Sequence, residues 1–431
     1  MNTQEIISIT IVLAALFAYI NHRIIKWPPT IGIMALSLIC SVILVALGNS
    51  KSLLSEKAIE LANSVDFQDV LMNFMLSFLL FAGAIHIDAG KLKAERWPVL
   101  LLATIGILVS TCLVGGMTWL LFKFFGVPIP FIYCLLFGSL ISPTDPIAVM
   151  GILKQANIPE SLEVKIAGES LFNDGIAVVI FISIAQIARS PDGAFSIAAI
   201  GTLFFQEAIG GLAFGAALGY VGFLALRSIN DYKVEVLITL AIVMGGYTLA
   251  SHLHVSGPLA MVVAGIITGN KAREGGMSAE TRDYLGKFWH LVDEILNAVL
   301  FLFIGLEMLI IKINTTVMII GVISILIVIL ARWISVILPV LLLRYKIKFE
   351  NNAIAILTWG GLRGGISVAL ALSLSTDMHR DELVLITYII VVFSILVQGL
   401  TIGKLVKKLQ GKNAVVNHKS LSNLFEIDMP S

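Results

Sequence analysis

Long apolar stretches alternate with short polar ones along almost the whole chain, and this pattern predicts helices that cross a membrane. Strands of a transmembrane barrel would alternate polar and apolar residues, whereas these stretches are continuously apolar for about 20 residues, the length of one helical crossing. The fold class is therefore all-α integral membrane, with thirteen transmembrane helices. Their predicted ranges are 5–24, 28–48, 67–87, 98–123, 130–153, 166–188, 203–226, 234–252, 256–270, 290–311, 315–343, 351–375 and 382–403.

The composition of the 431-residue chain excludes several classes of protein. Hydrophobic residues make up 58% and charged residues only 13%, against about 25% charged residues in a typical soluble domain. A soluble globular domain, a disordered chain and a nucleic-acid binder are all excluded by these values. The net charge of +1 gives no bias towards an acidic partner.

The basic residues of the loops predict the orientation of the chain. With the amino terminus outside, the inner loops and the tail hold 21 Lys and Arg residues and the outer loops hold 6, as the positive-inside rule requires. We therefore expect a transmembrane domain over residues 1–403 and a short cytoplasmic tail over 404–431. The start of the chain has no basic segment of the kind that precedes a cleaved signal peptide, so we expect the first helix to be retained.

Two of the predicted helices carry residues that break a helix near mid-span. The fifth contains Ser-Pro-Thr-Asp-Pro at 142–146, and the twelfth contains Gly-Gly-Leu-Arg-Gly-Gly at 360–365. Because these helices are seven apart, they cross the membrane in opposite directions, so helices 1–6 and 8–13 can form two inverted six-helix repeats. Interrupted helices at matching places in inverted repeats indicate the midplane site of a transporter. The alternative is a pair of ordinary kinks without a ligand.

Five ionisable residues lie near the middle of predicted spans, where charges are costly and are usually functional or paired. They are Asp145, Glu169, Asp174, Arg332 and Arg363. Two ion pairs among three acids and two bases leave one carboxylate without a permanent partner. That carboxylate is the candidate to carry a mobile cation.

The sixth helix favours Asp174 as this carboxylate. Ser170 and Asp174 are four residues apart and share a helix face with Asn173, whereas Glu169 lies about 140° round the helix from Asp174. The face offers hydroxyl, amide and carboxylate oxygens, the ligands that hard cations prefer, and Thr144 adds a hydroxyl and a free carbonyl. The predicted ion-binding set is Thr144, Asp145, Ser170, Asn173 and Asp174, with Thr144, Ser170 and Asp174 as ligands of Na⁺. The alternative is that Asp174 only forms a salt bridge.

Other features favour structural roles. Asp293, Glu294 and Glu307 fall towards the ends of the tenth predicted helix, where interfacial or packing contacts are the more common role. Glycines repeat every fourth residue at 211, 215 and 219, which indicates close packing between two helices.

Three motifs resemble those of a known family. Ser-Pro-Thr-Asp-Pro at 142–146, Gly-Glu-Ser-Leu-Phe-Asn-Asp-Gly at 168–175 and Trp-Gly-Gly-Leu-Arg-Gly-Gly at 359–365 are similar to those of the monovalent cation:proton antiporter-1 family, in particular its bacterial NhaP-type sodium/proton antiporters. The resemblance implies a thirteen-helix inverted-repeat fold, a homodimer in the bacterial plasma (inner) membrane, and exchange of Na⁺, Li⁺ or K⁺ for H⁺.

The resemblance also implies roles for individual residues. The residue matching Asp174 binds the ion and the proton alternately, and an Asn at the place of Asn173 accompanies electroneutral 1:1 exchange. Glu169 is implied to pair with Arg332, and this pair leaves Arg363 to lie near Asp145 at the crossing of the broken helices. Some family members carry an acidic residue in the third helix, where this chain has Phe-Ala-Gly-Ala at 81–84, so that ligand is absent.

Three other functions are weighed against antiport. A cation channel or uniporter would conduct without proton counterflow, but no filter sequence such as Thr-Val-Gly-Tyr-Gly is present. A sodium-coupled symporter for an organic anion stays possible on the same scaffold. An intramembrane enzyme is disfavoured because the chain has no His-Glu-x-x-His or Gly-x-Ser-x-Gly motif. We expect no enzymatic activity, no cofactor and no nucleic-acid partner, with Na⁺ and H⁺ as the transported ions and membrane lipid as the surroundings.

Overall fold

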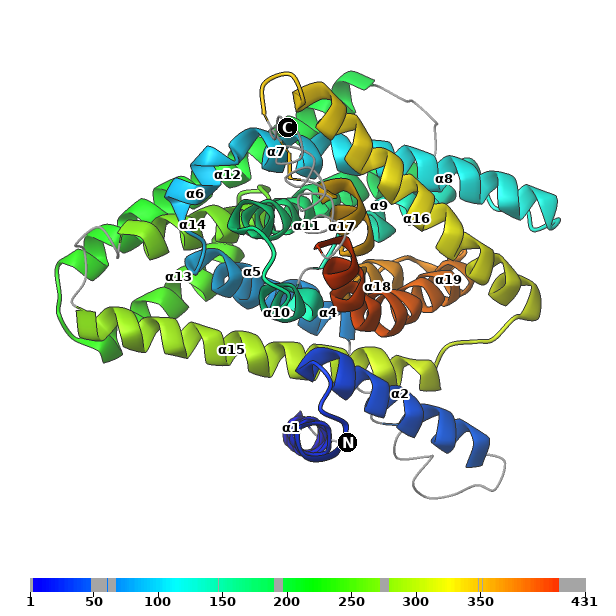
Figure 1. Ribbon diagram of the computed structural model, residues 1–431, viewed down its shortest axis with the longest axis horizontal. Helices are drawn as coiled ribbons and strands as arrows, with labels where there is room; N and C mark the ends of the chain where they lie inside the picture. Colours follow the sequence, from blue (N-terminus) through cyan, green and yellow to red (C-terminus); the bar gives the residue numbers. More distant parts are fainter. Residues whose placement is uncertain are drawn as a thin grey trace, which may run out of the picture.

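The computed structural model describes residues 3–47, 60, 67–145, 147–189, 197–271, 279–347, 349–350 and 352–410. Within these ranges every regular element is a helix (Figure 1), which agrees with the predicted fold class. Eight helices of the described chain are long and apolar enough to cross a membrane, and shorter apolar helices accompany them. Each predicted span coincides with helical residues of the described chain.

The helices of the first half of the chain are α1 (Thr3–Ile20), α2 (Pro29–Leu47), α4 (Phe67–Val70), α5 (Leu76–Ile85), α6 (Ala89–Ala94), α7 (Arg96–Leu101), α8 (Ile107–Phe124), α9 (Phe131–Ile141), α10 (Ile147–Gln155) and α11 (Glu160–Arg189). Those of the second half are α12 (Ile197–Arg227), α13 (Tyr232–His252), α14 (Gly257–Lys271), α15 (Ala279–Leu306), α16 (Thr315–Leu343), α17 (Ala353–Trp359), α18 (Gly365–Leu372) and α19 (Arg380–Phe393). Short π-helical turns continue several of them, namely η1 (Asn21–Ile25), η3 (Leu71–Met75), η4 (Leu102–Gly106) and η8 (Ser394–Gln398).

Several helices extend beyond the predicted apolar spans. α15 begins at Ala279, although the apolar pattern predicted a start at residue 290. The additional turns are amphipathic, and their apolar side chains Leu285 and Trp289 are 3% and 0% exposed, so packing inside the protein stabilises them. As a result, Asp293 lies in the middle of a long helix rather than in its first turn. The last helix continues to Gln410, past the predicted domain boundary at 403.

Both helices predicted to be broken are broken in the structure. α9 ends at Ile141 and α10 begins at Ile147, while α17 ends at Trp359 and α18 begins at Gly365. The two breaks meet, because the backbone N–H of Asp145 donates a hydrogen bond to the carbonyl of Leu362 at 2.8 Å. Figure 1 shows α17 and α18 near the middle of the view, with α15 below them and α16 above and to the right.

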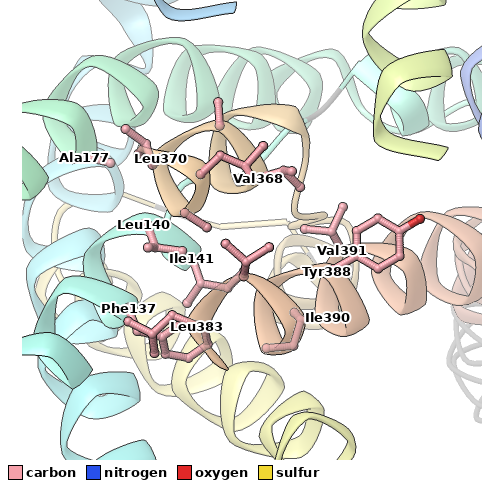
Figure 2. Close-up of a cluster of buried hydrophobic side chains, with 14 of the residues drawn as sticks. Phe137, Leu140, Ile141, Ala177, Val368, Leu370, Leu383, Tyr388, Ile390 and Val391 are labelled. Atoms are coloured by element: carbon pink, nitrogen blue, oxygen red, sulfur yellow. The ribbon is translucent and has the colours of Figure 1, made fainter. Parts of the chain in front are cut away.

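A dry cluster of side chains packs around one half of this crossing (Figure 2). Phe137 and Leu140 of α9 meet Val368 of α18 and Leu383 and Val391 of α19, and each of the five is at most 1% exposed. Burial of this kind holds α9 and α18 in place even though neither is long enough to be stable alone.

The predicted glycine stripe lies where α12 packs on α14. A Cβ atom added to Gly215 would lie 2.7 Å from the Cα of Ala260, and one added to Gly219 would lie 3.0 Å from the Cα of Ala264. Only glycine therefore allows the two backbones to approach this closely.

Candidate ion-binding site

The face of α11 that carries Asp174 forms hydrogen bonds with the break between α9 and α10. The Ser170 hydroxyl donates a hydrogen bond to the carbonyl of Thr144. The Asn173 amide nitrogen donates to the Thr144 hydroxyl at 2.8 Å, and the Thr144 N–H donates to the Asn173 amide oxygen at 3.4 Å. The Thr144 carbonyl was expected to be free. It accepts the Ser170 bond instead, because a broken helix leaves carbonyls without helical donors. The three residues nevertheless gather their oxygen atoms at one point, and all are buried.

Asp174 differs from its neighbours in having no fixed partner. No hydrogen bond or ion pair to its carboxylate is found within the part of the chain that the structure describes, and the side chain is only partly buried. Asp145 follows Thr144, which is bonded to Asn173 beside Asp174, so the two acidic residues lie near each other. Asp174 is therefore not locked to an arginine, which a carrier of a mobile cation requires.

Glu169 points away from this face, as the helical geometry predicted, and forms an ion pair with Arg332 of α16. The pair is bidentate, with the second bond from Nη2 to Oε2 at 3.0 Å, and both side chains are at most 6% exposed. Arg332 also donates from Nε and Nη2 to the carbonyl of Leu357, at 3.2 and 3.1 Å. This carbonyl lies in the last turn of α17, where the break removes its helical donor. Gly361 leaves room for the guanidinium, since a Cβ there would lie 3.1 Å from Cζ.

Arg363 lies in the other break and is 1% exposed. Its Nη1 donates to the carbonyls of Ser142 and Pro143, the latter at 2.9 Å. The guanidinium thus caps the carbonyl end of α9, beside the break that contains Asp145. The neighbouring Gly364 packs on Asp145, because a Cβ there would lie 2.6 Å from the Asp145 Cβ.

The arrangement can bind one hard monovalent cation. Hydroxyl, amide and carboxylate oxygens from α11 and from the break before α10 converge, and such oxygens suit hard cations. Among the five mid-span charges, Glu169 and Arg332 form an ion pair, and the formal charges of Arg363, Asp145 and Asp174 sum to −1. One negative charge is left over, which a single bound Na⁺ or proton would neutralise.

No pattern in the sequence predicted the buried lysine near the start of α11. Lys165 is 1% exposed and contacts Glu350 at 2.8 Å and Glu95 at 3.3 Å. Burial raises the pKa of Glu350, but hydrogen bonds from Lys165 and Ser161 outweigh it and hold the pKa below its usual value. These bonds join α11 to the segments before α7 and before α17. The partners are up to 185 residues apart in the chain, so no local pattern could reveal the cluster.

Comparisons with known proteins show the family to which the chain is similar. The family model described as "Sodium/hydrogen exchanger, transmembrane" matches residues 11–408. The Na⁺/H⁺ antiporter NhaP of Pseudomonas aeruginosa is 48% identical over 414 residues, covering 94% of this chain and 96% of that protein. The Na⁺/H⁺ antiporter NhaH of Halobacillus dabanensis is 37% identical over 348 residues, covering 80% and 84%. Among solved structures, the sodium proton antiporter MjNhaP1 of Methanocaldococcus jannaschii matches with a TM-score of 0.75 at 18% identity, covering 95% of this chain and 100% of that one.

Proposed function

Since this chain belongs to the sodium/hydrogen exchanger family, we propose that it is a secondary active transporter that exchanges Na⁺ for H⁺ across a membrane. The curated relatives named above are Na⁺/H⁺ antiporters, and the chain covers nearly the whole length of the first of them. The observation that carries the proposal is the mid-span carboxylate of Asp174, which has no hydrogen bond or ion pair within the described chain.

Competition at this carboxylate explains the coupling of the two ions. An uncompensated charge is costly in a medium of low dielectric constant. The site therefore moves poorly between the two faces of the membrane while Asp174 is empty and charged. It moves readily when Asp174 holds H⁺ or Na⁺. Each crossing in one direction then has to be matched by a crossing of the other ion, which is antiport rather than conduction.

The charge count supports electroneutral exchange of one Na⁺ for one H⁺. Asn173, next to Asp174, is a neutral amide committed to Thr144 by two hydrogen bonds. Asp174 is then the one carboxylate of this helix face that binds the transported ion, so each half-cycle moves one positive charge. Oxygen ligands of this kind also accept Li⁺ or K⁺, and both ions belong in the substrate titration.

We infer that the access path alternates through motion of one bundle against the rest of the molecule. The breaks are tied to each other through Asp145 and Leu362 and to α11 through Thr144, so α9, α10, α11, α17 and α18 are joined around the site. α12 and α14 form a closely packed pair that lies against α11. We further propose a homodimer in a bacterial inner membrane with the amino terminus outside, supported by the distribution of basic residues and by apolar side chains exposed along α1 and α12.

Purified protein in proteoliposomes with a preset pH gradient and a pH-sensitive dye tests the function. Addition of Na⁺ alone should collapse the gradient, with Li⁺ and K⁺ titrated in parallel at several pH values. Asp174→Asn should abolish the response, and Asp283→Asn, the same change at an exposed position on α15, should keep it.

Two further readouts separate the alternatives. Clamping the membrane voltage with K⁺ and valinomycin should leave the rate unchanged if exchange is 1:1, and a voltage-dependent rate would contradict electroneutrality. Na⁺ uptake without proton counterflow would indicate a channel, and a requirement for an organic anion would indicate a symporter. Retained antiport in folded Asp174→Asn would defeat the assignment of the site.

A further inference from the structure

Polar side chains form a stripe on one face of α15. His290, Asp293, Glu294 and Asn297 are spaced i, i+3, i+4 and i+7, so they cover only about 100° of the helix circumference. Every other residue from 291 to 306 is apolar or glycine. A stripe of this length on a helix in lipid needs a polar neighbour, because isolated polar groups are costly there.

The stripe leads from the surface to the ion-binding site. The side chains of His290 and Glu294 are 66% and 64% exposed, Asp293 is partly buried, and Asn297 is only 2% exposed. The outer end lies beside His86 at the end of α5, with the two imidazole centres 6.4 Å apart. At the inner end, Leu300, one turn beyond Asn297, packs on Gly365 at the start of α18, since a Cβ added to Gly365 would lie 2.5 Å from the Leu300 Cδ1. The inner end of the stripe therefore lies near the crossing of the broken helices.

Asn297 leaves one polar atom without a partner. Its amide nitrogen donates to the backbone carbonyl of Asp293 at 2.8 Å and to the Asp293 carboxylate at 3.0 Å. Both neighbours are acceptors, so the nitrogen has to face them and the amide cannot be flipped. The amide oxygen then has no hydrogen-bond donor within the described chain, although it is buried. Buried polar atoms normally have partners, so this oxygen indicates a missing ligand.

We propose that Asp293 and Asn297 form a second site for a monovalent cation, on the route between Asp174 and the membrane face at which α15 begins. The ligands are the Asp293 carboxylate and the unpartnered amide oxygen of Asn297, both of the kind that hard cations bind. Two protein ligands are too few to hold a cation firmly, so the ion keeps part of its water shell and moves on. The proposal rests on the proposed function, since it supplies that transporter with a station for its incoming ion.

The series Asp293, Asp145 and Asp174 explains why such a station helps. The negative charges act on each other in sequence, so the field near the crossing attracts cations before they reach Asp174. Asp293 concentrates Na⁺ on its own side of the membrane only. A purely structural hydrogen bond between Asp293 and Asn297 would show no preference for one side.

The test compares the apparent KM for Na⁺ on the two membrane faces, in everted and in right-side-out vesicles. In the Asp293→Asn variant, KM should rise about fivefold to tenfold on the face where α15 begins and stay within about twofold on the other face. The rate at saturating Na⁺ should change little, and Asp293→Glu should restore KM. Asp283→Asn on the same helix is the matched control, because its exposed carboxylate contacts Lys287 far from the crossing.

Each outcome decides the proposal. A rise in KM on one face supports the station, whereas an unchanged KM, or an equal rise on both faces, overturns it. Asn297→Ala gives a second test if Asp293→Asn does not fold, and it should raise KM on the same face. If the unmodified protein shows no Na⁺-driven collapse of a pH gradient, the proposed function itself fails. If the unmodified protein shows antiport and the KM of the variant is unchanged, only the second site fails.

Discussion

The ion pair between Glu169 and Arg332 gives a prediction whose size follows from the structure. Both side chains are at most 6% exposed, and the guanidinium donates to two carboxylate oxygens and to the carbonyl of Leu357. Glu169→Gln leaves the buried guanidinium facing a neutral amide, and removal of one partner from a buried pair costs about 3–5 kcal/mol. Arg332→Met leaves the buried Glu169 carboxylate without its cation, at about the same cost, and also removes the donors of the Leu357 carbonyl.

The double variant should be much less damaging than the sum of the two single variants. With both charges gone, no buried ion is left unpaired, and the losses are the partners of the Leu357 carbonyl and of the new amide, at about 1–3 kcal/mol for each unpaired group. We therefore expect a coupling energy of at least about 3 kcal/mol in a double-mutant cycle. The six tryptophans of the chain allow unfolding in detergent to be followed by intrinsic fluorescence. Additive effects of the two changes would refute the reasoning, because they would mean that neither charge depends on the other.

Two further predictions concern packing and pH. Gly215→Ala should destabilise the protein by about 1–3 kcal/mol, because its Cβ would collide with α14, whereas Gly245→Ala, which meets nothing within 4 Å, should be close to neutral in the same unfolding assay. The pKa of Glu350 lies below its usual value, so its contribution to stability is present above about pH 4.3 and is lost as the pH falls through the lower native pKa. Glu350→Gln should therefore lower the unfolding temperature at pH 7, and the effect should shrink as the pH falls through the native pKa. A difference that persists in acid would contradict this linkage.

The sequence predicted the helical spans and the two breaks because these depend on local chemistry. Continuous apolar residues predict a crossing, and the prolines at 143 and 146 and the glycines around Arg363 weaken a helix wherever they occur. The shared face of Ser170 and Asn173 also followed from helical geometry alone. The pairing of Glu169 with Arg332 was indicated only by the family resemblance, because spacing does not reveal which helix lies opposite.

The mid-helix position of Asp293 was not predicted, for a specific reason. Its helix was predicted to begin at residue 290, which placed this carboxylate at the membrane surface, where a charge needs no explanation. The earlier start at Ala279 places it in mid-helix. The spacing of Leu285, Trp289 and Val292 at four and three residues is a helical signal that could have shown this extension. The π-helical turns had no comparable signal, since they depend on tertiary packing.

The contact between the two breaks is made by the backbone, through the N–H of Asp145 and the carbonyl of Leu362. Such a bond does not depend on side-chain identity, so the frame of the crossing survives when the residues around it change. A change of one side chain at position 144, 170 or 173 would loosen the attachment of the break to α11 and leave this backbone contact between the breaks in place.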